Sequence, residues 1–534
     1  MQAKSESFMR GAFLITAAAF VSRLLGAVYR PVAQHFLGDQ GLALVSPPAN
    51  AYLIILAISS SGLNVAISRM VSERLALQDY RGARRLMRVA TGLLMASGLL
   101  FAILFALASP YLAAKQGVPE ATPGFLILSP AIFLVSLVVA FRGLYQGMQA
   151  MRPAALSQVV DQVGRVGGGL LLVALLTPYA LNMGAAGFNA GATAGVFLCT
   201  LYGAWVYWRD RPLDHWAKMD PVPDSLESVP LRELLVRFLS IALPISLVGA
   251  VQPLMGQIDS WYTIPRLLDI GVPMVQAREA LAHLVNAQTL RDLPSILSVA
   301  LYTSLVPALA ESAATRQFDQ ARRRVEASFR ITFLIGLPAT VGLVVGAQAA
   351  YGVFFSGSGY EVLAPLGWST LFLMVQQISS GILQGMGLIG VSVRNLLVGV
   401  VLKAVLTYWW LGIPALGVDG AAYAWTVAYL VIALLNLLAL RRQLDLRIRV
   451  RQDLLPPLLA SALMGLVIWL VQPVIFGQIH SHRLAGLLAI AAGGLAYGPF
   501  ILAVGGVREA DLRLVPGMRS AWIDLLKRLH LVRG

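Results

Sequence analysis

Two arginines interrupt the first long apolar segment of the sequence, and their guanidinium groups are suited to binding an anion. Arg23 and Arg30 are seven residues apart, nearly two turns of an α-helix, so both project from one face. Because a charge in hydrocarbon is costly, that face is expected to line a bundle interior or a water-filled cavity. The alternative is that each arginine pairs with a carboxylate or a helix-end carbonyl, with Arg30 reaching the outer end of the helix.

A second group of charges lies in the fifth apolar segment. Asp161 and Arg165 are four residues apart, the spacing at which two side chains meet on one helix face. A pair that neutralises itself needs no substrate, so we interpret these two residues as a structural ion pair. Arg291 and Asp292 in the eighth segment are adjacent, about 100° apart around a helix, and a structural role is favoured for them too.

The seventh apolar segment brings polar groups towards its outer half. Gln252, Gln257 and Asp259 lie in it, and Arg266 follows. A carboxylate at this depth can bind Na⁺ or a proton, or it can pair with an arginine of the first segment. The sequence leaves both interpretations of Asp259 open.

Several motifs of soluble chemistry are missing from the sequence. There is no Walker A loop, since none of the lysines follows a glycine; they are Lys4, Lys115, Lys218, Lys403 and Lys527. HExxH, GxSxG and Asp-x-Asp motifs are also missing, and the single cysteine, Cys199, excludes an intramolecular disulfide. We therefore expect neither an ATP-driven pump nor an enzyme, with no catalytic residue, no metal site and no cofactor.

The composition indicates which elements must position these charges. Of the 534 residues, 57% are hydrophobic and only 13% are charged, whereas a soluble protein has about 25% charged residues. Runs of about twenty apolar residues follow one another with short gaps, as transmembrane helices do. We predict an all-α polytopic membrane protein with about fourteen transmembrane helices, beginning with spans at 11–37 and 46–67.

Basic residues alternate in density from one loop to the next. Most of the 41 lysines and arginines lie in the loops on the same side of the membrane as the N-terminus. The positive-inside rule assigns this side to the cytoplasm. We therefore expect a multi-pass protein of the cell membrane with both termini cytoplasmic. The net charge of +15 follows from this topology and needs no nucleic-acid partner. Contact with anionic lipid headgroups is a further role for the basic clusters Arg81, Arg84, Arg85, Arg88 and Arg322, Arg323, Arg324.

An internal repeat organises the chain. Segment 73–85 aligns with 311–323, and the same displacement aligns 146–148 with 384–386. Six spans per half imply two lobes of the same orientation, related by a pseudo-two-fold axis along the membrane normal.

The repeat predicts three regions. Residues 1–220 form an N-terminal lobe, residues 221–445 form a C-terminal lobe, and residues 446–534 hold two appended helices and a cytoplasmic tail. The alignment also places Arg165 over Lys403. Four residues before Lys403 stands Gly399 instead of a carboxylate, so the Lys403 charge must be met from elsewhere, which makes it a candidate for lining a cavity.

Four stretches carry a family resemblance: VSRLLGAVYR at 21–30, GLNVAISRMVSE at 62–73, QIDS with IPRL at 257–260 and 264–267, and LPS with TSLVPA at 293–295 and 303–308. They resemble the SpoVB/YtgP-type polysaccharide biosynthesis proteins. These are relatives of the lipid II flippase MurJ in the multidrug/oligosaccharidyl-lipid/polysaccharide (MOP) exporter superfamily.

The resemblance implies two six-helix lobes arranged as a V, a rocking cycle, a cationic central cavity and two extra helices that can hold a lipid tail. Arg23 matches the family's cavity arginine, whereas Arg30 stands one residue later than the pattern, where Tyr29 takes its place. A further family arginine is replaced by the Ala57-Ile58 region. The expected cationic set is completed by Arg266, Lys403 and Arg69, and Asp259 resembles a carboxylate that some relatives use to bind sodium.

From these features we expect a flippase that carries an undecaprenyl-pyrophosphate-linked saccharide, the peptidoglycan precursor lipid II, from the inner to the outer leaflet by alternating access. Arginines bind diphosphate oxygens bidentately. Three energy sources are open: coupling to Na⁺, coupling to H⁺ and the membrane potential. Membrane lipid and cell-wall synthesis proteins are the expected partners of a monomeric protein.

Three alternatives are retained. The first is an exporter of another lipid-linked precursor, for teichoic acid, capsule or spore cortex. The second is a cation-coupled multidrug antiporter, disfavoured because the intramembrane charges of the N-terminal lobe are mostly basic: Arg23, Arg30, Arg142, Asp161 and Arg165. The third is a non-transporting scaffold for cell-wall enzymes.

Overall fold

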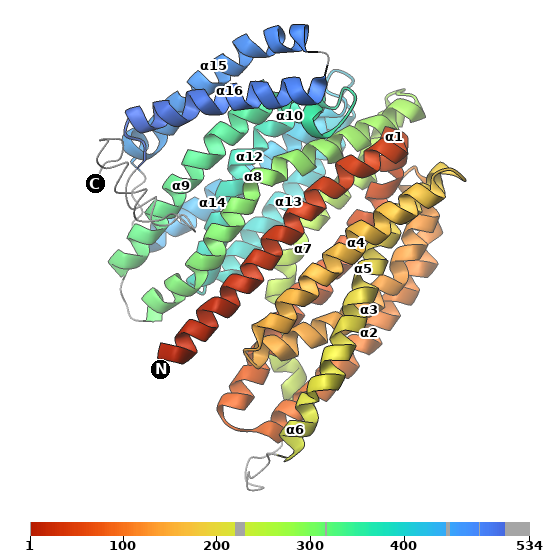
Figure 1. Ribbon diagram of the computed structural model, residues 1–534, viewed down its shortest axis with the longest axis vertical. Coiled ribbons are helices and arrows are strands. Elements are labelled where there is room, and N and C mark those ends of the chain that lie inside the picture. Colours follow the sequence, from red (N-terminus) through yellow and green to blue (C-terminus); the bar gives the residue numbers. More distant parts are fainter. Residues whose placement is uncertain (1, 219–229, 315–317, 445–448, 480, 508–534) are drawn as a thin grey trace. The chain divides into compact units, whose positions relative to one another are not determined.

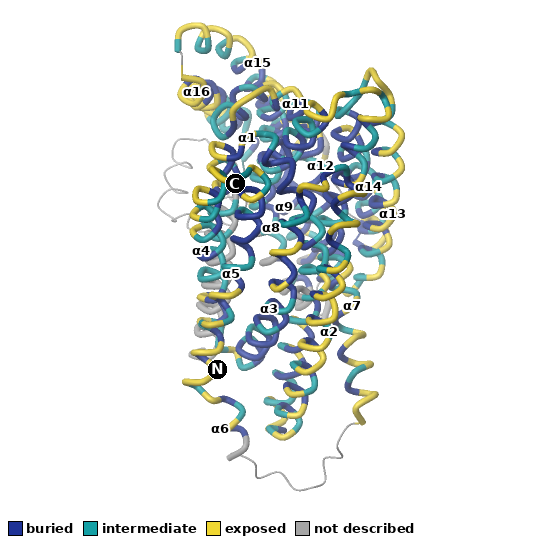
Figure 2. The backbone as a smooth tube through the Cα atoms, turned by 90° about the vertical axis from the view of Figure 1, so that its right-hand side faces the viewer, coloured by how far each residue is buried: buried dark blue, intermediate teal, exposed yellow. Residues whose placement is uncertain are grey.

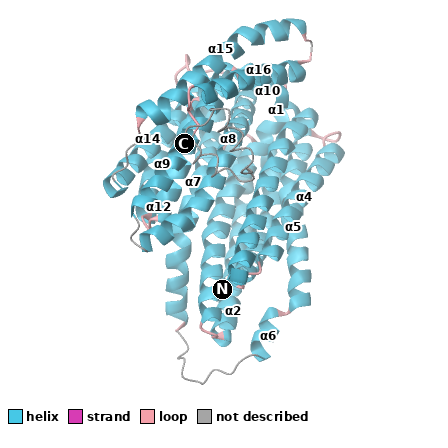
Figure 3. Cartoon of the chain, turned by 60° about the vertical axis from the view of Figure 1, so that its left-hand side comes forward, coloured by secondary structure: helices cyan, strands magenta, loops and turns pink. Residues whose placement is uncertain are grey.

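The computed structural model describes residues 2–218, 230–314, 318–444, 449–479 and 481–507. Within these ranges every regular element is a helix, and Figure 3 shows helices joined by short loops with no strand. The predicted all-α membrane fold is thereby confirmed. Helices satisfy their own backbone hydrogen bonds, which is the requirement that hydrocarbon imposes on a spanning segment.

The helices follow one another along the chain as labelled in Figure 1. Their bounds are α1 Gln2–Ala76, α2 Tyr80–Lys115, η1 Pro119–Ala121, α3 Thr122–Gly147, α4 Met151–Leu176, α5 Leu181–Asp210, α6 Pro212–Lys218, α7 Leu231–Asp269, α8 Met274–Ala314, α9 Phe318–Val345, α10 Ala347–Phe354, α11 Tyr360–Gly367, α12 Ser369–Gly385, α13 Ile389–Leu411, α14 Asp419–Leu444, η2 Val450–Leu454, α15 Leu455–Gln478 and α16 His482–Ala503.

The first helix is interrupted by a kink. Its 75 residues would measure about 110 Å if straight, far more than the hydrocarbon thickness of about 30 Å. Gly38 has φ 59° and ψ −173°, a conformation that breaks the helix and is accessible to glycine without steric cost. The predicted spans 11–37 and 46–67 are therefore the two halves of α1 on either side of Gly38.

Eleven of the described helices are long and apolar enough to cross a membrane, or twelve when α11 and α12, which meet at a 48° bend, count as one span. α1 counts once here, although it contains both of the first two predicted spans. The number fourteen stays a prediction that is compatible with these helices.

The chain divides into two compact units, residues 1–282 and 283–534. In the first unit, α3 is buried along most of its length and packs against α1, α2 and α5 (Figure 2). α4 packs on α5 through facing glycines: a Cβ at Gly191 would lie 2.4 Å from the carbonyl oxygen of Arg165. This unit includes α7, which lies along the second half of α1. The three predicted regions stay predictions.

The second unit has its core where α9, α12 and α14 meet the later part of α8. Val325, Phe329, Ile378, Ile382 and Leu440 are almost completely buried there. α15 and α16 run side by side, with α15 packed on α9 and α16 on α10 (Figure 1).

The two units have the same local structure where the sequence repeat is strongest. α3 ends at Gly147, α12 ends at Gly385, and a methionine N–H caps each helix by binding the carbonyls two and four residues earlier. A Cβ at Gly147 would lie 2.9 Å from the Ser68 carbonyl oxygen, and one at Gly385 would lie 3.1 Å from that of Val306. Ser68 and Val306 are themselves related by the repeat, so the local packing agrees with it.

The glycine contact between α4 and α5 predicts a large effect of a single methyl group. We expect Gly191→Ala to lower the free energy of unfolding by about 1–3 kcal/mol, because the helices must separate to admit the Cβ. The measurement is unfolding in detergent micelles. Gly167→Ala, at a position of α4 with nothing within 4 Å of the added Cβ, is the matched control and should be neutral or slightly stabilising. Equal destabilisation by both changes would contradict this account of the packing.

Candidate functional site

Three charged side chains meet in the first unit. Asp161 on α4 lies between Arg142 of α3 and Arg165 of its own helix. Arg142 Nη2 is 3.6 Å from Asp161 Oδ2, and Arg165 Nη2 is 3.8 Å from Asp161 Oδ1. Each side chain is about one fifth exposed. Two guanidinium groups sharing one carboxylate leave this cluster, which we call the Asp161 cluster, with an excess positive charge.

Arg142 is held in place by two further groups. Its Nε donates to Ser157 Oγ at 2.8 Å, and Nη2 lies 3.6 Å from Cys199 Sγ. The Ser157 hydroxyl in turn donates to the carbonyl of Ala154. Helices α4 and α5 therefore each contribute a side chain that orients this guanidinium of α3. The sequence identified Arg142 as an intramembrane charge, but its pairing with Asp161 joins two helices and was not predicted.

The Asp161 cluster retains unused hydrogen-bonding capacity. Asp161 Oδ1 and Arg165 Nε are buried atoms without a hydrogen-bond partner in the described part of the chain. The Tyr52 side chain is 1% exposed and interacts electrostatically with Asp161, Arg165 and Arg142. Because buried polar groups usually have partners, an unsatisfied set of this kind is suited to receiving a polar or anionic group.

Arg23 and Arg30, the two arginines of the first predicted span, lie on α1 before its kink. The side chain of Arg23 lies outside the described part of the structure. Arg30 is 9% exposed, and its Nη2 donates to Ser46 Oγ at 3.1 Å, across the kink of α1. The preceding Tyr29 donates to the carbonyl of Phe188 and stacks on its ring at 4.0 Å.

Asp259 lies in a buried polar layer between α1 and α7. Asp259 and Ser260 are fully buried, and Asn50 Nδ2 donates to Ser260 Oγ at 3.0 Å. Gln257 Nε2 donates to Gln116 Oε1 at 3.0 Å. Oxygen atoms of this kind are the ligands that hard cations prefer. No group of three His, Cys, Asp or Glu side chains that could hold a metal occurs among the described residues.

Arg69 and Arg266 each pair with a carboxylate on their own helix. Arg69 Nε is 3.0 Å from Glu73 Oε1, and its side chain is 63% exposed near the end of α1. Arg266 Nη1 is 2.9 Å from Asp269 Oδ2. Glu73 also accepts from Arg237 Nη2 of α7 at 2.7 Å. The structure thus places Arg69 and Arg266 in ion pairs of their own, separate from the Asp161 cluster.

Two cations of the second unit share one indole ring. Lys403 Nζ lies 4.4 Å from the centre of the Trp425 ring, and the Arg291 guanidinium carbon lies 4.3 Å from the same centre. Lys403 is fully buried and Arg291 is 1% exposed. Arg291 also pairs with Asp292 at 2.8 Å and lies 5.5 Å from the Tyr429 ring. A desolvated cation–π contact can contribute about 2 kcal/mol, which helps to offset the cost of burying each charge.

A structural role was expected for Arg291 and Asp292, and the two residues form an ion pair, but the burial of Arg291 beside Lys403 was not anticipated. No motif marks Trp425 as the acceptor of two cations, because the three residues come from α8, α13 and α14. Lys403 therefore has its charge met by an aromatic face within the core of the second unit.

Comparison with known proteins identifies the family of this chain. A model of polysaccharide biosynthesis proteins matches residues 8–313, more than half of the chain. The protein belongs to the polysaccharide biosynthesis protein family. Stage V sporulation protein B of Bacillus subtilis is 27% identical over 525 residues, covering 96% of this chain and 98% of the relative. The lipid II flippase MurJ of the same organism is 26% identical, covering 92% and 94%. The resemblance read from the sequence motifs is confirmed.

Solved structures share the fold. An inward-facing multidrug transporter of the MATE family has a TM-score of 0.67 at 18% identity, covering 79% of this chain and 94% of that one. The lipid II flippase MurJ in an inward closed conformation has a TM-score of 0.64 at 17% identity, covering 92% and 98%. A MOP-superfamily transporter from Pyrococcus furiosus, described as having a binding pocket of reverse polarity, has a TM-score of 0.59 at 19% identity, covering 82% and 95%.

The geometry of this polysaccharide biosynthesis protein predicts energetic coupling between Asp161 and its arginines. We expect Asp161→Asn to lower the free energy of unfolding by about 1–3 kcal/mol, because two close guanidinium groups lose their shared counter-charge and solvent screens them only partly. Adding Arg165→Gln should recover part of the loss, with a coupling energy of about 0.5–3 kcal/mol. A double-mutant cycle in detergent measures it, and strict additivity would contradict the shared ion pair.

The cation pair on Trp425 predicts that stability and transport respond differently to one change. Lys403→Met removes the cost of burying one charge and its repulsion of Arg291 on the same ring, and it keeps the volume, so the free energy of unfolding should not fall. If the Lys403 charge takes part in transport, the transport activity of this variant in cells should fall even though the protein is stable. Trp425→Leu is the comparison, because it removes the ring that Lys403 and Arg291 share and should destabilise the protein. A strongly destabilised Lys403→Met protein would show that the lysine is a structural requirement.

Proposed function

We propose that this protein is a flippase that moves a lipid-linked saccharide precursor from the inner to the outer leaflet of the cell membrane by alternating access. The proposed substrate is an undecaprenyl-pyrophosphate-linked saccharide, the peptidoglycan precursor lipid II. The observation that carries the proposal is the excess positive charge of the Asp161 cluster within a membrane-spanning unit. Family membership and near full-length similarity to a lipid II flippase support it.

The charge of the cluster matches the proposed cargo. A diphosphate carries about two negative charges, and a guanidinium group binds such oxygens with two parallel hydrogen bonds. Arg165 Nε provides a donor that is not used within the described structure. Arg23, Arg30, Arg266, Lys403 and Arg69 stay the sequence-based candidates for the rest of the cationic surface, and Asp259 stays the candidate for ion coupling.

The membrane potential supplies an energy source that needs no nucleotide. Moving one negative charge outward across an inside-negative membrane releases about 2.3 kcal/mol per 100 mV. Two charges on the cargo double this driving force. With both termini cytoplasmic, as the basic loops predict, the cargo enters from the side on which such precursors are made. We propose that the protein acts as a monomer and passes its cargo to cell-wall synthesis proteins, without itself being an enzyme.

A second candidate is an exporter of the lipid-linked precursor of another polysaccharide. It is favoured by the similarity to stage V sporulation protein B, which covers 98% of that relative. Both candidates require an anionic lipid-linked cargo, so the Asp161 cluster supports them equally. They differ in the sugar part of the cargo.

A multidrug antiporter is disfavoured, although several structural neighbours are multidrug transporters of the MATE family. Their likeness is below 25% identity and concerns the fold. A cationic drug would be repelled by the two arginines around Asp161. The Pyrococcus furiosus transporter of reverse pocket polarity is described as suggesting a different function, so the sign of charge is an informative feature of this fold.

A depletion experiment tests the proposed function. In a bacterium depleted of its own lipid II flippase, the wild-type protein should restore growth. Arg165→Gln and Arg23→Ala should restore at least tenfold fewer colonies, because each removes a charge that is proposed to bind the diphosphate. Arg442→Gln, a loss of the same charge at an exposed site at the end of α14, is the control and should behave as wild type.

A parallel strain separates the two candidate substrates. In Bacillus subtilis lacking stage V sporulation protein B, the wild-type protein is scored by its yield of mature spores. Rescue there without rescue of growth would assign the protein to the second candidate. Failure in both strains, with the protein present in the membrane, would overturn the proposal of a flippase.

A further inference from the structure

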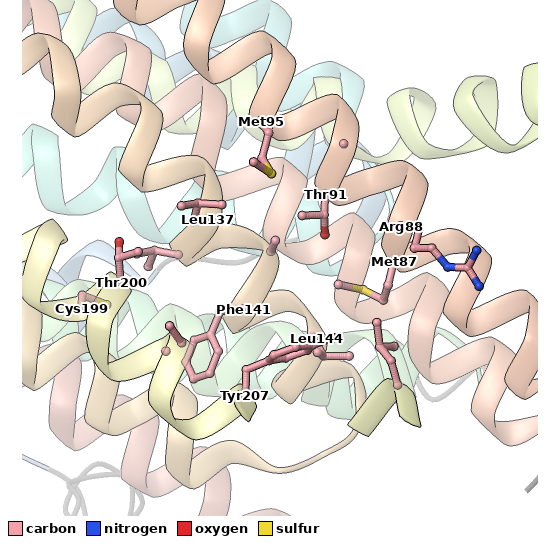
Figure 4. A pocket seen from close by; sticks show the side chains of 16 residues that line it. Met87, Arg88, Thr91, Met95, Leu137, Phe141, Leu144, Cys199, Thr200 and Tyr207 are labelled. Atoms are coloured by element: carbon pink, nitrogen blue, oxygen red, sulfur yellow. The ribbon is translucent and has the colours of Figure 1, made fainter. Parts of the chain in front are cut away.

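A cavity of about 540 Å³ lies in the first unit, where α2 and α5 flank α3 (Figure 4). Its size is within the range of about 300–1,000 Å³ that is usual for small-molecule sites. It is separate from the Asp161 cluster, except that Cys199, which contacts Arg142, forms part of the cavity wall. The end of α6 also contributes, through Leu213.

The interior of the cavity is apolar. Its floor is formed by α3 with Leu137, Phe141 and Leu144, and its walls include Met87 and Met95 of α2. Methionine side chains are flexible and adapt to irregular hydrocarbon, which favours a chain-like occupant. The polar side chains of the lining are few, and its single charged residue is Arg88.

The helix faces beside the cavity have the composition of a lipid-facing surface. On α2, Leu99 is 51% and Leu107 is 74% exposed, and on α5 Leu201 is 51% exposed. Trp205 and Trp208 follow at 54% and 69% near the end of α5. Tryptophans are enriched where a membrane protein meets the headgroup layer. The cavity therefore lies beside the lipid-facing surface, with one end at headgroup depth.

Basic groups gather at that end. The Arg209 guanidinium lies 5.0 Å from the Trp205 ring and pairs with Asp210 at 2.9 Å, whereas that of Arg211 lies 5.8 Å from the Trp208 ring. Arg88 borders the cavity with its stem, while its guanidinium extends beyond the other lining side chains in Figure 4. No carboxylate of the described residues lies within ion-pair distance of Arg88, and Arg84 stands one turn before it on α2.

We propose that this cavity binds one anionic phospholipid of the phosphatidylglycerol type. An acyl chain occupies the apolar space over α3, and the phosphate contacts Arg88 at its edge. The positive charge at the edge matches the phosphate, and the apolar lining matches the acyl chain. The position at headgroup depth matches the part of the lipid where the two meet. The lipid belongs to the leaflet at the Arg88 end of α2, which the basic loops assign to the cytoplasmic side. This inference does not depend on the proposed flippase activity.

Filling the cavity provides the first test. Gly92 lines it, and nothing lies within 4 Å of a Cβ added there, so Gly92→Leu adds a large side chain to the lining without a backbone clash. Gly167→Leu is the matched control, because Gly167 on α4 is equally open and does not line the cavity. Binding of phosphatidylglycerol to the full-length protein in detergent is measured by native mass spectrometry during a lipid titration. Gly92→Leu should weaken the tightest binding event at least tenfold, and Gly167→Leu should not change it.

Removing the charge provides the second test. Arg88→Gln should abolish the preference for phosphatidylglycerol over phosphatidylethanolamine, while the acyl chain still binds. Arg442→Gln is the control, because it loses the same charge at an exposed site at the end of α14 and does not line the cavity. Melting temperatures of all variants show whether they fold.

Each outcome decides the proposal. Loss of binding in Gly92→Leu together with loss of preference in Arg88→Gln supports it. Equal binding by wild type and a folded Gly92→Leu protein overturns it, as does a wild-type protein that binds no phosphatidylglycerol. The remaining outcome is that a polyprenyl phosphate, recognised by its mass, co-purifies with the wild-type protein and is lost from Gly92→Leu. That result would overturn the phospholipid assignment and identify the occupant as the lipid tail of a cargo.

Discussion

The sharing of Asp161 by Arg142 and Arg165 is the interaction on which the chemistry of the first unit depends. It joins α3 to α4 in a low-dielectric setting, where a lone guanidinium would be costly. The close approach of α4 and α5 makes it feasible, because glycines at the contact let the helix that bears Asp161 and Arg165 pack tightly on the one that bears Cys199. The carboxylate lowers the cost of two cations without cancelling both, so the unit keeps a positive charge available to an anion.

The second unit meets the same problem differently. Lys403 occupies the position that corresponds to Arg165 in the repeat, yet its charge lies over the Trp425 ring and beside Arg291. An aromatic face attracts a cation without adding a negative charge, so this arrangement also preserves net positive charge, although the groups are buried. The repeat has thus retained the helical framework, including the glycine contacts at the ends of α3 and α12, while the means of stabilising a buried cation has diverged.

The lipid-facing surface of the first unit is organised by depth in the membrane. Tryptophans and arginines at the end of α5 mark the depth of the headgroups, and the apolar cavity over α3 extends from that depth towards the hydrocarbon. A protein whose cargo has a lipid part has to keep such surfaces distinct from its polar cluster. Here Cys199 of α5 lines the cavity and also contacts Arg142 of the Asp161 cluster.

The sequence by itself determined the class of fold, because hydropathy alone reports which segments must form helices in a bilayer. It also identified the repeat, the family and the spacing of Asp161 and Arg165, since residues four apart on a helix are neighbours in any fold. Only the tertiary structure decided that Arg142 shares Asp161, that Lys403 and Arg291 share Trp425, and that Arg69 is exposed and paired with Glu73. The first two contacts join different helices. Helix packing sets which faces meet, and no local pattern encodes that choice.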